Sequence, residues 1–332
     1  TAGDADFSSY VAIGNSLTAG YMDGTVYRVG QTYSFPNLLA QQFALVGGGE
    51  FTQPSYAEDV DNLGGFAGVP FSTRRVIDAS TGTVENIAGS STITLTAQAT
   101  AYNNMGVPGA KSFHLGFPGY AALNPYFARH ATSPTATVLG DAMSKNPTFF
   151  TNWIGANDVL AYATNGGAQA DGNTPAADHN LTGNMNPATY GGNDITNATA
   201  FENVYSTIIN TLTSGGANGV VATVPSVTAI PYFTTVPYAP LTAQSIGKGL
   251  APSGSDTATQ IAYGTAAMNQ LNTELYGLLK GVFTAYGEPN RVKLLNTATE
   301  NPVLIYDVDA VDRSAQISGY LQTVLLYDAT TA

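Results

Sequence analysis

Residues 11–20, Val-Ala-Ile-Gly-Asn-Ser-Leu-Thr-Ala-Gly, contain the feature that decides the fold. A short apolar strand ends there in a Gly-Asn-Ser turn, and the residues after the turn favour a helix. A strand that runs directly into a helix is the repeating unit of α/β folds. Ser16 lies at the junction, where a hydroxyl can project from the sheet edge among backbone N–H groups. Ser16 is therefore a candidate nucleophile, although serine is equally common as a plain helix cap.

The rest of the chain repeats this alternation of strand and helix. Apolar or β-branched runs predict strands at residues 9–14, 101–107, 147–154 and 218–224. The last of these runs ends at a proline and is predicted to be buried. Helical patterns lie among the strands at residues 33–46, 135–145 and 198–214. We therefore expect a three-layer α/β/α sandwich with a mostly parallel central sheet.

Two further segments end predicted strands with residues suited to chemistry. Residues 103–110, Asn-Asn-Met-Gly-Val-Pro-Gly-Ala, form a glycine-rich turn that contains Gly109. Residues 149–158, Phe-Phe-Thr-Asn-Trp-Ile-Gly-Ala-Asn-Asp, break at a glycine and then present Asn157. Ligands bind outside the carboxyl ends of strands in open parallel sheets, so both segments are expected at the same edge as Ser16.

The three segments together resemble the motifs of the SGNH (GDSL-type) hydrolases. The matching residues are Gly14-Asn15-Ser16-Leu17, Gly109 and Gly155-Ala156-Asn157-Asp158, in the order of the family. The phrases at residues 10–21, 107–114 and 230–237 also resemble a secreted or lipoprotein branch of the family in Bacteroidetes-type bacteria. The resemblance covers most of residues 6–240 and implies an SGNH-like fold with serine ester hydrolysis. Asn15 departs from it, because the family more often has Asp at this position.

The resemblance implies an acyl-serine mechanism with three principal residues. Ser16 is the nucleophile and supplies one backbone N–H to the oxyanion, and Gly109 supplies a second. Asn157 supplies a side-chain amide, because a carboxylate there would repel the developing charge. Supporting roles fall to Gly14, Asn15, Gly155 and Asp158. Simpler interpretations stay open: Gly109 as a turn glycine, Asn157 as a loop former and Asp158 as a loop-ordering or capping residue.

The family completes its site with an Asp-x-x-His block near the C-terminus, and this chain has no such pair. The segment Asp309-Ala-Val-Asp312 has an acid where the imidazole is required. Among the three histidines, we expect His114 at the pocket rim, His130 at the surface or at a helix cap, and His179 in a solvated loop. Without a base, a serine hydroxyl is a poor nucleophile at neutral pH. Either the catalytic block lies beyond residue 332, which we favour, or a divergent member of the family has lost it.

Composition narrows the range of partners. The chain has 332 residues, of which 44% are hydrophobic and only 10% are charged. Its 11 basic and 23 acidic residues give a net charge of −12, which disfavours binding to nucleic acid. Cysteine is absent and no cluster of His and carboxylates has metal-ligand spacing, so we expect neither a metal nor another cofactor. The expected partner is a small ester or an acylated glycan.

The composition also bears on location. A lightly charged chain rich in Gly, Thr and Asn is common among exported proteins, and no apolar run reaches the roughly 20 residues that span a bilayer. We expect an extracellular or outer-surface protein, held to a membrane only by a lipid anchor upstream of Thr1.

We expect residues 1–332 to form a single domain with insertions at about 47–100, 164–197 and 234–302. The first insertion contains the alternating segment Ser91–Ala97, which predicts an antiparallel ribbon. The second is expected to be a lid, a binding loop or a mobile segment. The third contains a long helix predicted at residues 257–285.

Three functions follow from these patterns. The leading prediction is an extracellular or surface-anchored serine ester hydrolase, either a lipase-like carboxylesterase or a carbohydrate esterase. The alternative is a non-catalytic SGNH-fold surface protein that binds glycan or takes part in surface assembly, which the missing base favours. A structural surface component with a coincidental Gly-Asn-Ser-Leu turn is a third reading, and the three ordered motifs disfavour it.

Overall fold

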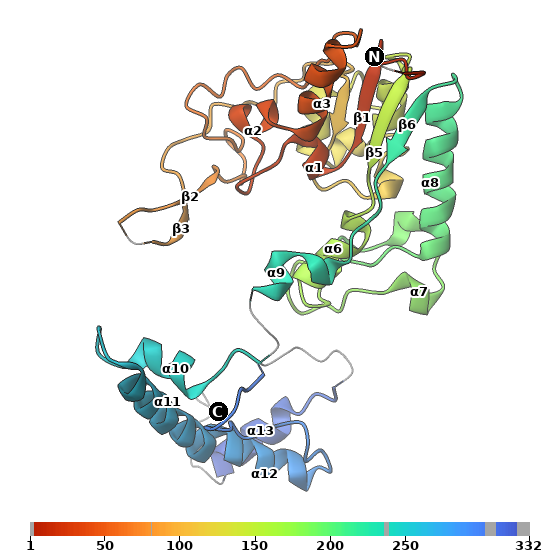
Figure 1. The fold of residues 1–332 in the computed structure, drawn as a ribbon. Coiled ribbons are helices and arrows are strands. Elements are labelled where there is room, and N and C mark those ends of the chain that lie inside the picture. The colour runs from red at the N-terminus through yellow and green to blue at the C-terminus, as the bar shows by residue number, and fades with distance from the viewer. Residues whose placement is uncertain (1–2, 81, 236–238, 303–309, 324–332) are drawn as a thin grey trace. The chain divides into compact units, whose positions relative to one another are not determined.

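The structure is a computed structural model that describes residues 3–80, 82–235, 239–302 and 310–323 (Figure 1). Contacts within the chain divide it into two compact units, Thr1–Ser226 and Val227–Ala332, where the sequence led us to expect one domain. No helix in the described ranges is both long enough and apolar enough to cross a membrane.

The first unit is built on a four-stranded sheet in the order β4-β1-β5-β6 (Figure 1). Its pairings are all parallel, with Gly14 of β1 opposite Gly106 of β4 and Trp153 of β5. The carboxyl ends of β4, β1 and β5 therefore meet at one edge. The predicted α/β class and the four predicted strands are confirmed, with the strand bounds β1 Tyr10–Gly14, β4 Asn104–Gly106, β5 Phe149–Trp153 and β6 Asn218–Val221.

Helices pack against both faces of this sheet. Tyr10 and Ala12 of β1 lie in a small cluster with α3, whereas the alternate residues Val11 and Ile13 lie in the larger core with α5 and α8. Successive side chains of a strand point to opposite faces, so this division places helices on either side. The helices of the first unit are α1 Ser16–Ala19, α2 Arg28–Thr32, α3 Phe35–Ala44, α4 Pro125–His130, α5 Val138–Met143, α6 Asn157–Thr164, α7 His179–Thr182 and α8 Ala198–Thr213, with 3-10 turns η1 Ser112–His114, η2 Tyr120–Ala122 and η3 Pro187–Thr189.

Two details of the strand predictions are wrong. The last strand, β6, was predicted to be buried, but all of its residues are exposed, because among the described strands it pairs only with β5 and forms the sheet edge. The antiparallel ribbon predicted at Ser91–Ala97 is instead formed by β2 Arg75–Ile77 and β3 Val84–Asn86. Ile93 is fully buried and its C=O accepts the N–H of Ala67. Of the alternating apolar residues at 91–97 only Ile93 is buried, whereas Leu95 is exposed, so the alternation does not mark a strand face.

The insertion at residues 164–197 is more ordered than its composition suggests. It contains α7 and η3 and is closed by two isolated bridges, Ala168 with Pro175 and Asp178 with Ile195. The second of these bridges joins the two halves of the insertion next to the start of α8. The insertion is therefore a folded element of the first unit.

The second unit is a group of helices. The helix predicted at residues 257–285 is continuous and contains one π-helical turn at Asn272–Tyr276. The backbones of α10 and α11 lie so close that a Cβ on Gly247 would collide with the C=O of Gln260. These contacts give the unit packing of its own. Its elements are η4 Val227–Ala229, α9 Pro231–Thr234, α10 Ala243–Leu250, α11 Thr257–Leu271, α12 Gly277–Ala285 and α13 Ser314–Thr323.

Candidate functional site

Ser16 is the first residue of α1, two positions after the end of β1. The buried Asn15 caps this helix, because its Oδ1 accepts the N–H of Leu17 at 3.1 Å. Asn15, and not Ser16, is therefore the capping residue of this helix. Within the described part of the chain the Ser16 hydroxyl has no hydrogen-bond partner, and an N–H at the first helical position has no intrahelical acceptor. Ser16 thus presents two free polar groups.

Small residues bring α1 directly against the strand ends. A Cβ on Gly14 would collide with Thr18 and would lie 2.7 Å from the C=O of Trp153. A Cβ on Gly106, the partner of Gly14 in β4, would collide with the N–H of Ala19. The absence of a side chain at Gly14 therefore lets α1, which begins with Ser16, pack close to the sheet edge.

Gly109 is the exposed residue of its turn, and its neighbours on both sides are buried. Gly109 is exposed and has φ +80°, a left-handed conformation that favours glycine. The turn is fixed on both sides, because Asn124 Nδ2 donates to the C=O of Pro108 at 2.8 Å and the Ala110 N–H donates to the C=O of Val107 at 3.1 Å. The Gly109 N–H has no partner among the described residues. Gly109 is thus a turn glycine that also presents a free donor.

Asn157 connects the end of β5 to this turn. It begins α6, and its Nδ2 donates to the C=O of Ala110 at 2.9 Å. A carboxamide nitrogen carries two hydrogens, so one orients the side chain while the other remains for a ligand. The structure therefore brings Ser16, Gly109 and Asn157 to one sheet edge from three adjacent strands, with β1 in the middle.

Asp158 and Gly155 order the segment around Asn157. Asp158 is 3% exposed, and its carboxylate accepts the N–H of Ser112 at 2.9 Å and the Ser112 hydroxyl at 2.8 Å. Burial raises the pKa of Asp158, although these hydrogen bonds act in the opposite direction. Gly155 has φ +123°, and a Cβ there would lie 2.6 Å from Val224. Both residues have the contacts of loop-ordering groups.

His114 lies beside the Gly109 turn, but it is not a base in this arrangement. Its Nδ1 accepts the Lys111 N–H at 3.0 Å, and its ring stacks on Tyr120 with centroids 4.4 Å apart. Burial and then the Lys111 charge lower the pKa of His114 to about 4, so the ring is neutral at pH 7. A neutral imidazole that accepts at Nδ1 carries its proton on Nε2. His114 therefore offers a donor and has no free lone pair for a serine proton.

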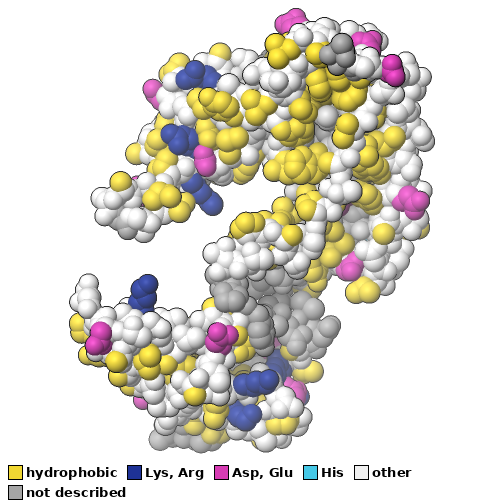
Figure 2. Space-filling model, in the orientation of Figure 1, with side chains coloured by type: hydrophobic (Ala, Val, Ile, Leu, Met, Phe, Trp, Pro, Cys, Tyr) yellow, Lys and Arg dark blue, Asp and Glu magenta, His cyan; other side chains and the backbone are white. Residues whose placement is uncertain are grey.

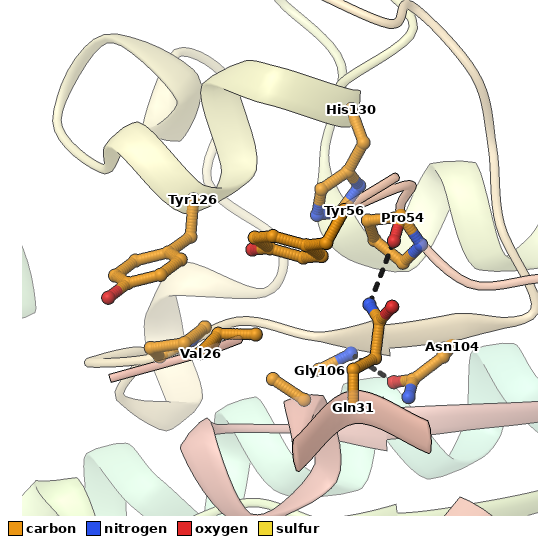
Figure 3. Close-up of a pocket in the computed structure, with 10 residues that line it drawn as sticks. Val26, Gln31, Pro54, Tyr56, Asn104, Gly106, Tyr126 and His130 are labelled. Atoms are coloured by element: carbon orange, nitrogen blue, oxygen red, sulfur yellow. Dashed lines mark hydrogen bonds between the residues drawn. The ribbon is translucent and has the colours of Figure 1, made fainter. Parts of the chain in front are cut away.

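His130 was expected at the surface or at a cap, and it is buried instead, with 2% exposure. Together with Tyr56 and Gln31 it lines a cavity of about 10 Å³ (Figure 3). A cavity of this volume has room for about one water molecule. Burial and then Arg129 lower the pKa of His130 to about 3. No described group bonds to its Nδ1. This space is too small for a substrate and is not the site.

His179 was expected to be solvated, and this is also wrong, because it is only 6% exposed. Its Nε2 lies 2.9 Å from Asp194 Oδ2, and its Nδ1 lies 2.9 Å from the Thr182 hydroxyl. The ring also stacks on Tyr190, with centroids 3.8 Å apart. Both ring nitrogens are occupied, so His179 is not available to Ser16.

The acidic residues that the structure describes form no ligand cluster. No group of three or more His and carboxylates is placed to hold a metal ion in the described ranges. Asp309 lies outside the described residues, and the Asp312 carboxylate accepts the Ser314 N–H at 2.8 Å at the start of α13.

Sequence reasoning missed three residues that build the site. Asn124 caps α4 and is followed by a proline at the first helical position, which is a readable signal. Lys111 and Asp194 had no readable signal, because the hydrogen bond that joins them spans 83 positions. All three act on the Gly109 turn or on the loop beside it.

Comparison of the chain with models of known families, with curated proteins and with solved structures finds no match in any of the three.

Proposed function

We propose that the protein is an SGNH-type serine ester hydrolase that acts through an acyl-serine intermediate. The observation that carries the proposal is the convergence of Ser16, Gly109 and Asn157 at one sheet edge, each with an unused hydroxyl or N–H group. The α/β architecture with helices on both faces of a parallel sheet is compatible with the three-layer SGNH fold.

In the proposed reaction Ser16 Oγ attacks the ester carbonyl carbon, and its proton passes to a general base. The carbonyl oxygen becomes an oxyanion that accepts hydrogen bonds from the N–H groups of Ser16 and Gly109 and from the second Asn157 N–H. Collapse of this intermediate expels the alkoxide, which takes up the proton, and leaves the acyl-serine. Water activated by the same base then releases the acid and restores the serine.

The proposed reaction needs a general base for the Ser16 proton. His114 and His179 are held by other hydrogen bonds, and His130 is buried beside a separate small cavity, so the proposal requires a base that these three residues do not supply. Free imidazole is a suitable substitute, because it has the pKa of a histidine side chain.

The test is labelling by a fluorophosphonate probe, with and without added imidazole. We expect wild type to be labelled at Ser16 when imidazole is present and much more slowly without it, and S16A to remain unlabelled. Ser9 is the matched control, since its hydroxyl is bonded to the C=O of Lys145 before β1 begins, and S9A should label like wild type. Absence of a Ser16 adduct in the presence of imidazole would overturn the proposal.

The proposed substrate is a small ester or an acylated glycan outside the cell. Its support is the neutral character of the site and surface: charged side chains are sparse on the face drawn in Figure 2, and the donors at the site edge are uncharged. Hydrolysis of p-nitrophenyl acetate compared with release of acetate from acetylated xylan would separate the two substrate types.

A non-catalytic surface protein that binds glycan is the second candidate. The observation in its favour is that, in the described part of the chain, no histidine or carboxylate is hydrogen-bonded to the Ser16 hydroxyl. Binding of acetylated xylan by both wild type and S16A, together with no labelling of Ser16, would support it.

A further inference from the structure

The insertion at residues 164–197 is organised around Asp194. Its carboxylate accepts the side-chain N–H of Gln169 at 2.6 Å, the N–H groups of Ala177 and Gly191 at 2.8 and 2.6 Å, and His179 Nε2 at 2.9 Å. These donors come from four positions along the insertion. Burial would raise the pKa of Asp194, but the hydrogen bonds lower it below its ordinary value. One carboxylate therefore fixes most of the insertion as a unit.

A buried lysine joins this unit to the Gly109 turn. Lys111 follows Gly109 by two residues and is 4% exposed, and its Nζ donates to the backbone C=O of Asp194 at 2.8 Å. Burial lowers the pKa of Lys111, while the carboxylates of Asp158 and Asp194 act in the opposite direction. A lysine is rarely buried unless its ammonium has partners, so this contact is a specific one.

A series of aromatic rings makes a second connection between the same two segments. Phe113 lies 5.9 Å from Tyr190 of the insertion, edge to face, and 4.5 Å from His114. His114 in turn stacks on Tyr120, and Tyr190 stacks on His179. Packed rings of this kind add stabilisation beyond the area they bury.

A third connection runs through the residue after Asn157. The N–H of Thr196, at the end of the insertion, donates to the C=O of Asp158 at 3.0 Å, and the Asp158 carboxylate holds Ser112. The insertion is thus connected both to the Gly109 turn and to the start of α6. These are two of the three elements that supply oxyanion donors.

We propose that Lys111 is a positioning residue, which fixes the Gly109 turn against a rigid wall formed by residues 164–197. The inference rests on the proposed function, since the Gly109 N–H matters only where an oxyanion is bound. Lys111 itself touches neither the serine nor the substrate. It acts by holding the backbone donor two residues away in place, and the wall is no mobile lid.

The test compares K111M with K248M, because Lys248 is an exposed lysine of the second unit. We expect K111M to slow fluorophosphonate labelling of Ser16 at saturating probe by about tenfold or more, part of the loss expected for one donor, with half-saturating probe concentration changed less than about twofold. In K111M the rate of amide hydrogen exchange should rise in residues 107–112 and in residues 166–194 together. K248M should match wild type in all three measurements.

A second variant guards against failure of K111M to fold. Y190L removes the ring that meets Phe113 from the side of the insertion and leaves the Lys111 contact in place. We expect joint, smaller increases in exchange of both segments and labelling slowed by about twofold to fivefold, less than the loss of a whole donor. Exchange that rises in one segment alone, or unchanged labelling in both variants, would overturn the inference. If wild type itself is never labelled, the proposed function fails, and the exchange measurements still decide whether the two segments are coupled.

Discussion

The sheet edge around Ser16 and the insertion at residues 164–197 differ in how many of their polar groups are hydrogen-bonded. At the Ser16 edge, a hydroxyl and two backbone N–H groups lack partners among the described residues. In the insertion, the Asp194 carboxylate, both His179 ring nitrogens and the Lys111 ammonium that reaches it are all bonded. Most polar groups in folded proteins are bonded, so a group of free donors needs an explanation. The comparison indicates that one region supplies rigidity and the other supplies unused donors.

The largest expected effect comes from removing the centre of the bonded region. D194A leaves four donors without their acceptor, including His179 in a buried position. We expect the free energy of unfolding to fall by about 3–5 kcal/mol, as for loss of one partner of a buried pair. Urea unfolding measures this, with D171A as the control, because the Asp171 carboxylate caps an exposed turn. A change below about 1 kcal/mol in D194A would contradict the view that the insertion depends on this carboxylate.

His130 adds a third case to this comparison, because its Nδ1 has no hydrogen-bond partner although the side chain is buried. Its pKa of about 3 in the folded state lies below the ordinary value, so the unfolded chain binds this proton first as the pH falls. The neutral His130 therefore favours the folded state fully above about pH 6.5. This contribution to the free energy of unfolding is lost as the pH falls toward 3, by about 1.4 kcal/mol per pH unit. Urea unfolding between pH 6 and 4 should show a steeper loss in wild type than in H130Q. Equal slopes in the two proteins would contradict this prediction.

Asn157 belongs to both kinds of region, since one N–H is bonded and one is free. N157D replaces the bond to the C=O of Ala110 with a repulsion between two oxygens. We expect a loss of about 1–3 kcal/mol in unfolding free energy at pH 7 and a drop in labelling of Ser16 of about 10²-fold or more. N210D on the exposed face of α8 is the control and should change neither. Retained labelling in N157D would remove the carboxamide from the oxyanion site.

The smallest effect on stability is expected at Ser16. Because its hydroxyl has no described partner, S16A should unfold within about 0.5 kcal/mol of wild type. S112A is the comparison, since the Ser112 hydroxyl donates to the buried Asp158 carboxylate, and it should cost about 1–2 kcal/mol. A large destabilisation in S16A would show that the hydroxyl is a structural group.

The sheet could be predicted from the sequence because its strands are apolar runs bounded by glycine or proline. Strands β1 and β5 were placed to within two residues at each end for that reason. Burial of β6 was not predictable, since the same β-branched run serves a central or an edge strand, and its order in the sheet depends on distant pairing. The alternation at Ser91–Ala97 likewise did not predict the ribbon, because only Ile93 of its apolar residues is buried and the pairing strands are β2 and β3.

At the site, the sequence predicted the free groups and missed the bonded ones. Ser16, Gly109 and Asn157 follow strands, and parallel strands bring their carboxyl ends together, so local patterns were enough. His130 was expected at the surface or at a helix cap because it follows Arg129, and His179 was expected in a solvated loop because its segment is poor in structure. Both are buried through contacts with residues remote in the chain or across the insertion, and such contacts leave no local periodicity.

The position of β1 has a consequence for how the protein is made. Among the described strands it is the first to be synthesised, yet it pairs with β4 and β5, whose residues Asn104 and Phe149 are synthesised much later. Parallel, long-range pairing folds slowly and leaves apolar segments exposed in the meantime. The nascent chain must therefore carry Val11 and Ile13 without their partners until Trp153 has emerged. The Ser16 edge can therefore assemble only after Asn157 has been synthesised.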